Sequence, residues 1–136
     1  MISADELLKP VSAEKPCGDD ISYDAQFIEL ETLMRGKPET QFSAAEEPNW
    51  KVLRDRCLEL WKKSKDLRVA TALALAELKT EGFPGFRESL ALINGLIEKN
   101  WNELYPRLDP ADGNDPTQRV NIIASLAAPA GTFGDP

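Results

Sequence analysis

The segment LRVATALALAEL, residues 67–78, is apolar on nearly every side when it is drawn as a helix. A helix of this kind is buried all round, in the centre of a bundle or in a membrane. Its apolar stretch at residues 69–76 is far shorter than the roughly 20 residues that span a bilayer. Asp66 can cap its start, and Gly82 stands where a C-cap glycine is expected. The segment therefore predicts the central helix of a bundle.

Other segments carry helical periodicity or cap signals, and none shows the two-residue alternation of a half-buried strand. The sequence thus predicts an all-α fold: a compact bundle of about six helices with long loops and no sheet. Three helices are expected before the central one: from Ser3 to before Pro10, from Asp24 to Gly36, and from Asn49 to about Ser64. Two are expected after it. One runs from a GFPGF turn to Pro106, and the other begins at Asp115, with Gln118 as its capping-box partner, and runs through residue 127.

The chain has 136 residues, the size of one domain that needs neither disulfides nor metals to build a core. We expect residues 1–128 to form the helical domain. The tail APAGTFGDP has the composition of an interdomain linker. Residues 129–136 are therefore expected to begin a linker to a C-terminal region that this sequence lacks.

The net charge of -7 argues against nucleic acid as a partner, because an acidic chain repels phosphate backbones. The first residues show neither a basic start nor an apolar stretch, so no secretory signal is recognised. Cys17 and Cys57 form no pairing motif, which fits a reducing compartment. These observations predict a cytoplasmic protein without a membrane span in this fragment.

The chain contains no histidine, which removes the commonest general base and the usual zinc ligand. What remains is carboxylate chemistry or an oxygen-ligand metal site, and Asp109, Asp112 and Asp115 are the candidates for it. An EF-hand reading from Asp109 fails, because Ala111 occupies the third position. Turn and cap chemistry explains the same aspartates, so no catalytic, cofactor-binding or metal-binding residue is predicted. A carboxylate-dependent metal-binding or hydrolytic domain centred on residues 109–115 stays open as the alternative.

Two arginines, Arg68 and Arg119, stand near expected helix starts, where the helix dipole opposes a positive charge. They therefore need acidic partners. We predict structural roles for Asp66, Asp109 and Asp115 as helix caps or ion-pair partners, with internal bridges from the arginines to loop aspartates such as Asp109 or Asp112. The other role that fits is an exposed anchor for another protein.

Several stretches, in this order and spacing, resemble the ImpA N-terminal domain of TssA-like proteins of bacterial type VI secretion systems. The strongest parts are PCGDD followed by YD, the helix start DLRVA, the turn GFPG, and WNELYPRLDP followed by NDPTQRVN. The resemblance covers nearly the whole chain. It does not separate relatives that initiate or cap assembly from those that terminate the sheath.

The resemblance implies a non-enzymatic assembly factor without cofactors, whose partners are baseplate and tail tube or sheath proteins. It also implies a homo-oligomer of the full-length protein, formed through the absent C-terminal region. Self-association of this domain through the expected third helix is an alternative that sequence leaves open. For the binding face we predict Phe42 and Trp50, since both are large apolar groups beside the polar linker at residues 36–48.

Overall fold

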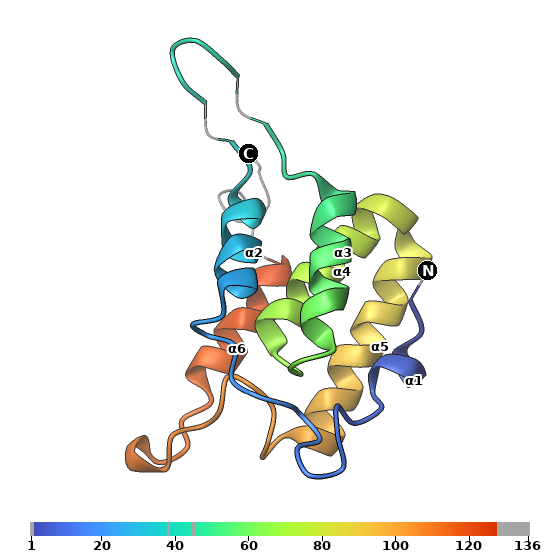
Figure 1. Cartoon of the computed structure of the whole chain (residues 1–136), viewed down its shortest axis with the longest axis vertical. Helices are drawn as coiled ribbons and strands as arrows, with labels where there is room; N and C mark the ends of the chain where they lie inside the picture. The colour runs from blue at the N-terminus through green and yellow to red at the C-terminus, as the bar shows by residue number, and fades with distance from the viewer. Residues whose placement is uncertain (1, 38, 45, 128–136) are drawn as a thin grey trace.

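The computed structural model describes residues 2–37, 39–44 and 46–127, and within them every regular element is a helix. This confirms the predicted all-α class (Figure 1). The α-helices are α1 (Ala4–Leu7), α2 (Ala25–Arg35), α3 (Trp50–Trp61), α4 (Leu67–Glu81), α5 (Phe83–Asn100) and α6 (Thr117–Ala124), with short 3-10 helices η1 (Pro110–Asp112) and η2 (Ser125–Ala127). The expected linker at 129–136 lies outside the described residues.

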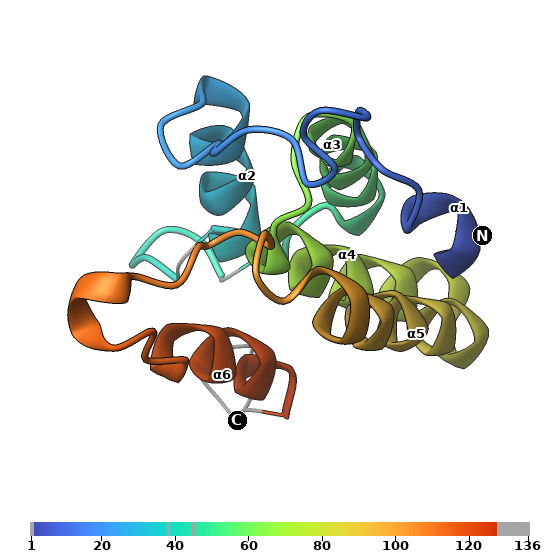
Figure 2. The same cartoon turned by 90° about the horizontal axis from the view of Figure 1, so that it is seen from below.

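Helix α4 is the centre of the molecule. It packs against α3, α5 and α6, and every residue from Val69 to Glu77 is buried. Figure 2 shows α2 and α3 on one side of α4 and α6 on the other. Because burial of apolar surface is the main stabilising term in folding, the apolar residues 67–78 organise the fold as predicted. None of the described helices is long and apolar enough to cross a bilayer.

Side-chain caps start three of the longer helices at the predicted residues. The Asp24 carboxylate accepts a bond from the Gln26 amide at 2.8 Å, and Asp66 accepts one from the Arg68 amide at 2.8 Å. Asn49 caps α3 through the amide of Val52. Each acceptor satisfies a backbone donor that the first helical turn leaves unpaired.

The boundaries of α5 differ from the prediction at both ends. Its first turn includes Phe83 and Pro84, so the expected GFPGF turn is reduced to Gly82, whose φ of +74° suits glycine. At the other end, α5 stops at Asn100 instead of continuing to Pro106. There the chain turns and pairs with the start of α4, since the Tyr105 carbonyl accepts a bond from Leu67 N at 2.8 Å. These tertiary hydrogen bonds replace the helical ones that periodicity favoured.

Helix α1 is shorter than expected, because it ends at Leu7. Its segment is held by carboxylates of the two longest helices: the Ile2 amide donates to Glu77 and the Ala4 amide to Glu88, both at 3.1 Å. The side chain of Leu8 lies against Gly95 of α5. The first residues thus fasten α1 to the bundle.

Candidate functional site

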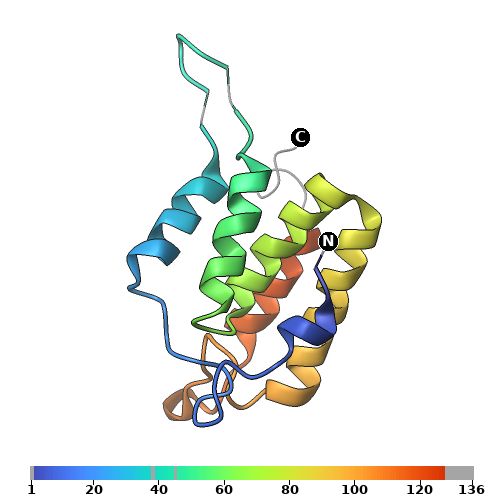
Figure 3. The same cartoon turned by 45° about the vertical axis from the view of Figure 1, so that its right-hand side comes forward.

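The polar linker before α3 folds back on itself as a short hairpin that projects from the body of the molecule (Figures 1 and 3). Lys37 and Glu46 exchange backbone hydrogen bonds of 2.9 and 2.8 Å, and the amide of Thr40 donates to Ser43 at 2.9 Å. We call the described residues of 36–48, together with Trp50, the hairpin surface. It connects the end of α2 to the start of α3.

Phe42 lies in the two-residue turn of this hairpin, and its side chain is 88% exposed. The Thr40 hydroxyl accepts bonds from the amides of Phe42 and Ser43 at 3.2 and 3.1 Å, which fixes the turn locally. An exposed phenyl ring on a projecting turn gains free energy by entering an apolar site of another molecule, about 1.5–3 kcal/mol for full burial. The predicted residue therefore has the exposure that a binding anchor requires.

Trp50 is placed differently from Phe42. It is the first residue of α3, it is half-buried against the core, and Lys79 Nζ lies 5.7 Å from its ring centroid. Its indole Nε1 is buried without a hydrogen-bond partner among the described residues. Trp50 therefore supports the base of the hairpin surface and offers a partner only part of its ring.

Arg68 and Asp66 form a compact unit at the start of α4. The Asp66 carboxylate, which is fully buried, accepts bonds from Arg68 Nε at 3.0 Å and from Arg68 Nη2 at 2.7 Å. The guanidinium also donates to the Ser22 hydroxyl and lies 4.4 Å from the Phe27 ring centroid. Burial opposes its charge, but the bonds and charge of Asp66 outweigh burial and raise the pKa of Arg68. This unit links α4 to α2.

Arg119 has no acidic partner among the described residues, which corrects the expected bridges to Asp109 or Asp112. Its buried guanidinium donates to the carbonyls of Trp101, Leu104 and Pro106 at 2.6, 2.6 and 2.9 Å. It also stacks 4.5 Å from the Trp101 ring centroid. Carbonyls after the end of a helix lack intrahelical donors, and the planar fork of arginine supplies several at once. Burial lowers the pKa of Arg119.

The aspartates at 109–115 serve the local backbone. Asp109 accepts a bond from the Ala111 amide at 2.8 Å and starts η1, and Asp115 accepts one from the Thr117 amide at 2.9 Å before α6. The Thr117 hydroxyl is the main cause that lowers the pKa of Asp115. The expected Gln118 capping box is not formed, because α6 begins at Thr117. In the described chain, no three His, Cys, Asp or Glu side chains are grouped to hold a metal ion.

Both cysteines are free and buried, Cys17 beside the start of α4 and Cys57 inside α3. Burial raises the pKa of each thiol, which disfavours the reactive thiolate. Neither cysteine therefore has the surroundings that would activate its thiol as a nucleophile.

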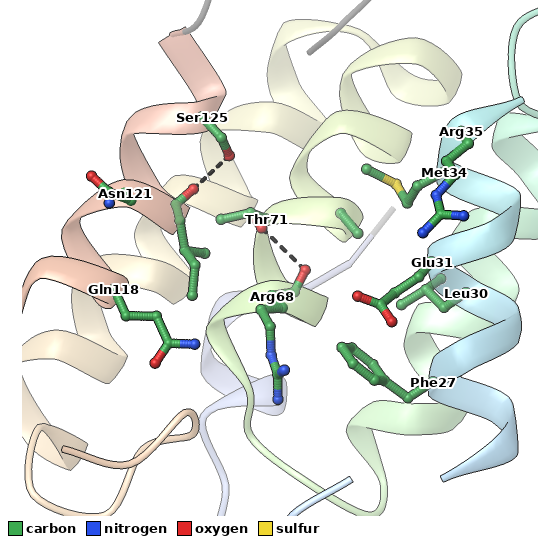
Figure 4. A pocket seen from close by; sticks show the side chains of 12 residues that line it. Phe27, Leu30, Glu31, Met34, Arg35, Arg68, Thr71, Gln118, Asn121 and Ser125 are labelled. Carbon is green, nitrogen blue, oxygen red and sulfur yellow. Dashed lines mark hydrogen bonds between the residues drawn. The ribbon is translucent and has the colours of Figure 1, made fainter. Parts of the chain in front are cut away.

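A groove that sequence reasoning missed lies between three helices (Figure 4). It measures about 490 Å³. It is lined by α2 from Phe27 to Arg35, by α4 from Arg68 to Ala72, and by α6 and the first residue of η2 from Gln118 to Ser125. We call it the α2–α4–α6 groove. Periodicity places Phe27, Leu30 and Met34 on one face of α2, but it gives no information on which distant helix faces them.

Comparisons with known proteins agree with this architecture. Residues 8–128 match the family described as ImpA, N-terminal, type VI secretion system. The chain is 42% identical over 132 residues to the type VI secretion system component TssA1 of Pseudomonas aeruginosa, a match that covers 94% of this chain and 38% of that protein. The N-terminal domain of TssA from Burkholderia cenocepacia, a solved structure that includes the conserved ImpA N-terminal region, superposes with a TM-score of 0.77 at 29% identity. That match covers 93% of this chain and 47% of the solved chain, so the present chain spans less than half of either relative.

Proposed function

Because the chain belongs to the ImpA N-terminal family of type VI secretion system proteins, we propose that it is a non-enzymatic docking domain of an assembly factor. Its partners are baseplate and tail tube or sheath components of the secretion apparatus. The main support for this proposal is the family match over residues 8–128. The projecting hairpin, with the exposed Phe42 at its tip, supports it further.

The chemistry of the described side chains supports a role without catalysis. The aspartates at 109–115 are engaged with backbone amides, and both thiols are buried. Two of the buried charged side chains, Arg119 and Asp66, are engaged with groups of the same chain. Such internal pairing stabilises the fold and leaves these groups unavailable for a substrate.

The hairpin surface is the face that we propose for docking. Lys37 and Glu46 close its base with backbone bonds and an ion pair of 3.4 Å, and Thr40 orders the turn beneath Phe42. A turn that is already ordered loses less conformational entropy on binding than a free loop does. Phe42 would thus act as an anchor in an apolar pocket of the partner.

The remaining parts of the proposal concern the longer protein. We place it in the cytoplasm, where baseplate and sheath proteins assemble. We further propose that a C-terminal region outside this sequence forms the homo-oligomer, so that several copies of the docking domain act together and gain avidity.

A capture experiment tests the function. Residues 1–136 are immobilised, a lysate from cells with an active secretion apparatus is passed over them, and mass spectrometry identifies the retained proteins. Retention of baseplate, tube or sheath proteins above the level on an unrelated helical domain is the expected result. Their absence, with the immobilised domain shown to be folded by circular dichroism, would contradict the proposal.

A further inference from the structure

The two strands of the hairpin surface approach each other closely where they leave the bundle. Gly36 ends α2, and its amide donates to the Leu33 carbonyl at 3.2 Å. A Cβ built on Gly36 would overlap the Glu46 carbonyl oxygen and would lie 3.1 Å from Pro48 N. Only a residue without a side chain allows this approach.

The backbone conformation of Gly36 is a second reason for glycine at this position. Its φ of +61° and ψ of -152° lie in a region that essentially only glycine populates. The chain passes there from α2 into the hairpin (Figure 3). In the next step, Lys37 and Glu46 exchange their two backbone bonds. The conformation of Gly36 therefore sets the direction in which the first strand leaves α2 and brings Lys37 opposite Glu46.

The second strand is tied to the bundle through side chains that are largely exposed. Glu47 Oε1 lies 3.5 Å from Lys79 Nζ of α4, and the same ammonium lies 5.7 Å from the Trp50 ring centroid. An ion pair between exposed side chains contributes little to stability, because water screens it. The close fit at Gly36 and the paired backbone bonds thus hold the hairpin more firmly than these side chains do.

The order of the turn around Phe42 depends on the pairing of these strands. Thr40 and Ser43 exchange backbone bonds of 2.9 and 3.4 Å on either side of Phe42, and the Lys37–Glu46 pair closes the hairpin at its base. An ordered turn loses less conformational entropy on binding than a turn whose strands have separated. A change at the base of the hairpin therefore reaches Phe42 through the strands between them.

We propose that Gly36 is the positioning residue of the hairpin surface: its close fit against Glu46 and Pro48 pairs the two strands and presents Phe42 to a partner in an ordered turn. This inference rests on the docking role proposed for Phe42 and adds the residue through which that role depends on the end of α2. A side chain at position 36 disturbs the hairpin while the Phe42 ring stays exposed.

Pulsed electron spin resonance tests the position of the hairpin. Nitroxide labels are attached to cysteines introduced at Ala44 of the hairpin and at Ala91 on the exposed surface of α5. Cys17 and Cys57 are buried, so their thiols stay unlabelled. Gly36→Ala is expected to shift or broaden the distribution of distances between the two labels. A parental distribution in the folded variant would overturn the proposal, whatever the partner of the domain is.

Gly113→Ala is the matched control for backbone strain. Gly113 also has a positive φ, of +74°, but a Cβ there would meet no heavy atom of the described chain within 4 Å. It follows η1 and lies outside the hairpin. Both substitutions strain the backbone, and only Gly36→Ala forces two strands apart. The label distances in Gly113→Ala should therefore equal those in the parent, and an equal change in both variants would contradict the steric explanation.

A second variant opens the hairpin from its other strand. Glu46→Pro removes the amide that donates to the Lys37 carbonyl at 2.8 Å and leaves the end of α2 unchanged. It therefore keeps the test available if Gly36→Ala does not fold. Glu46→Pro is expected to change the label distances as Gly36→Ala does. Parental distances would show that the paired strands do not hold the hairpin and would reject the proposal.

Binding measurements test whether the position of the hairpin matters for docking. The probe is a purified baseplate, tube or sheath protein that the parent domain retains, and biolayer interferometry measures its Kd. Gly36→Ala is expected to raise Kd by about tenfold, and Gly113→Ala to leave it unchanged. The double variant Gly36→Ala/Phe42→Ala should bind like Phe42→Ala alone, because a residue that acts through Phe42 has no further effect once the ring is removed. Additive losses would indicate a general structural role and would refute the positioning role.

The same measurements separate this inference from the docking function. Parental Kd in Gly36→Ala with a displaced hairpin, while Phe42→Ala weakens binding, would reject the positioning role and leave the docking function intact. Parental Kd in Phe42→Ala would reject docking through the hairpin, and the role of Gly36 with it.

Discussion

Arg119 joins α6 to the segment that follows α5 through three bonds to backbone carbonyls. We predict that Arg119→Met lowers the free energy of unfolding by about 2–4 kcal/mol, because three carbonyls near one another lose their shared donor. Urea denaturation followed by tryptophan fluorescence measures the change. The exposed Arg87→Met is the matched control and should stay within about 0.5 kcal/mol of the parent. Equal losses in both variants would show that the guanidinium has no special structural role.

Lys65 gives a prediction about pH. Its side chain is almost fully buried, donates to the Leu7 carbonyl at 2.6 Å, and has a pKa that burial lowers. Between that lowered pKa and the usual value of about 10.4, the unfolded chain binds more protons, so stability rises with pH through this window. Below the lowered pKa, the folded protein bears the full cost of the buried charge.

Replacing Lys65 by methionine removes that cost while the Leu7 carbonyl keeps its bond from Trp61 Nε1 at 2.8 Å. We therefore expect Lys65→Met to be more stable than the parent at pH 7 by about 1 kcal/mol, and to lose the alkaline rise in stability. Urea midpoints measured from pH 7 to pH 10 test both expectations. A less stable variant that retains the rise would contradict this explanation.

Helix α5 contains two glycines with different neighbours: Gly85 lies close to the end of α4, whereas Gly95 lies against a flexible side chain. A Cβ at Gly85 would lie 2.8 Å from Glu81 Cβ and 3.0 Å from the Glu77 carbonyl oxygen, whereas one at Gly95 would meet only the flexible Leu8 side chain. We predict that Gly85→Ala destabilises by about 1–3 kcal/mol and that Gly95→Ala stays within about 1 kcal/mol of the parent. Thermal melting compares the two, and an equal loss at both sites would refute the distinction.

Local sequence patterns predicted some helix positions and boundaries but not others. Residues 67–78 predicted the central helix, and Asp24, Asn49 and Asp66 predicted where three helices begin, because amphipathicity and capping are local properties. The start and end of α5 were not predictable in this way. The end depends on the bonds between Tyr105 and the segment at the start of α4 and on the Arg119 contacts, which join residues far apart in sequence.

At the scale of the whole molecule, the fold class and family followed from sequence, but the shape of the surface did not. Phe42 was predicted as a binding residue from its polar surroundings, yet the hairpin beneath it depends on pairing between Lys37 and Glu46. The α2–α4–α6 groove depends on the distance between α2 and α6, which no periodicity encodes. The exposed hairpin tip is the surface that we propose for docking.

We propose that this domain docks secretion components through the hairpin tip. The most direct test is biolayer interferometry with a purified baseplate, tube or sheath protein that the parent domain retains, comparing the parent with Phe42→Ala and Phe83→Ala. Phe83 is 80% exposed and lies at the start of α5, which makes it a matched control. We expect Phe42→Ala to raise Kd by about tenfold or more and Phe83→Ala to leave it unchanged. Unchanged affinity in folded Phe42→Ala, or an equal loss in both variants, would contradict it.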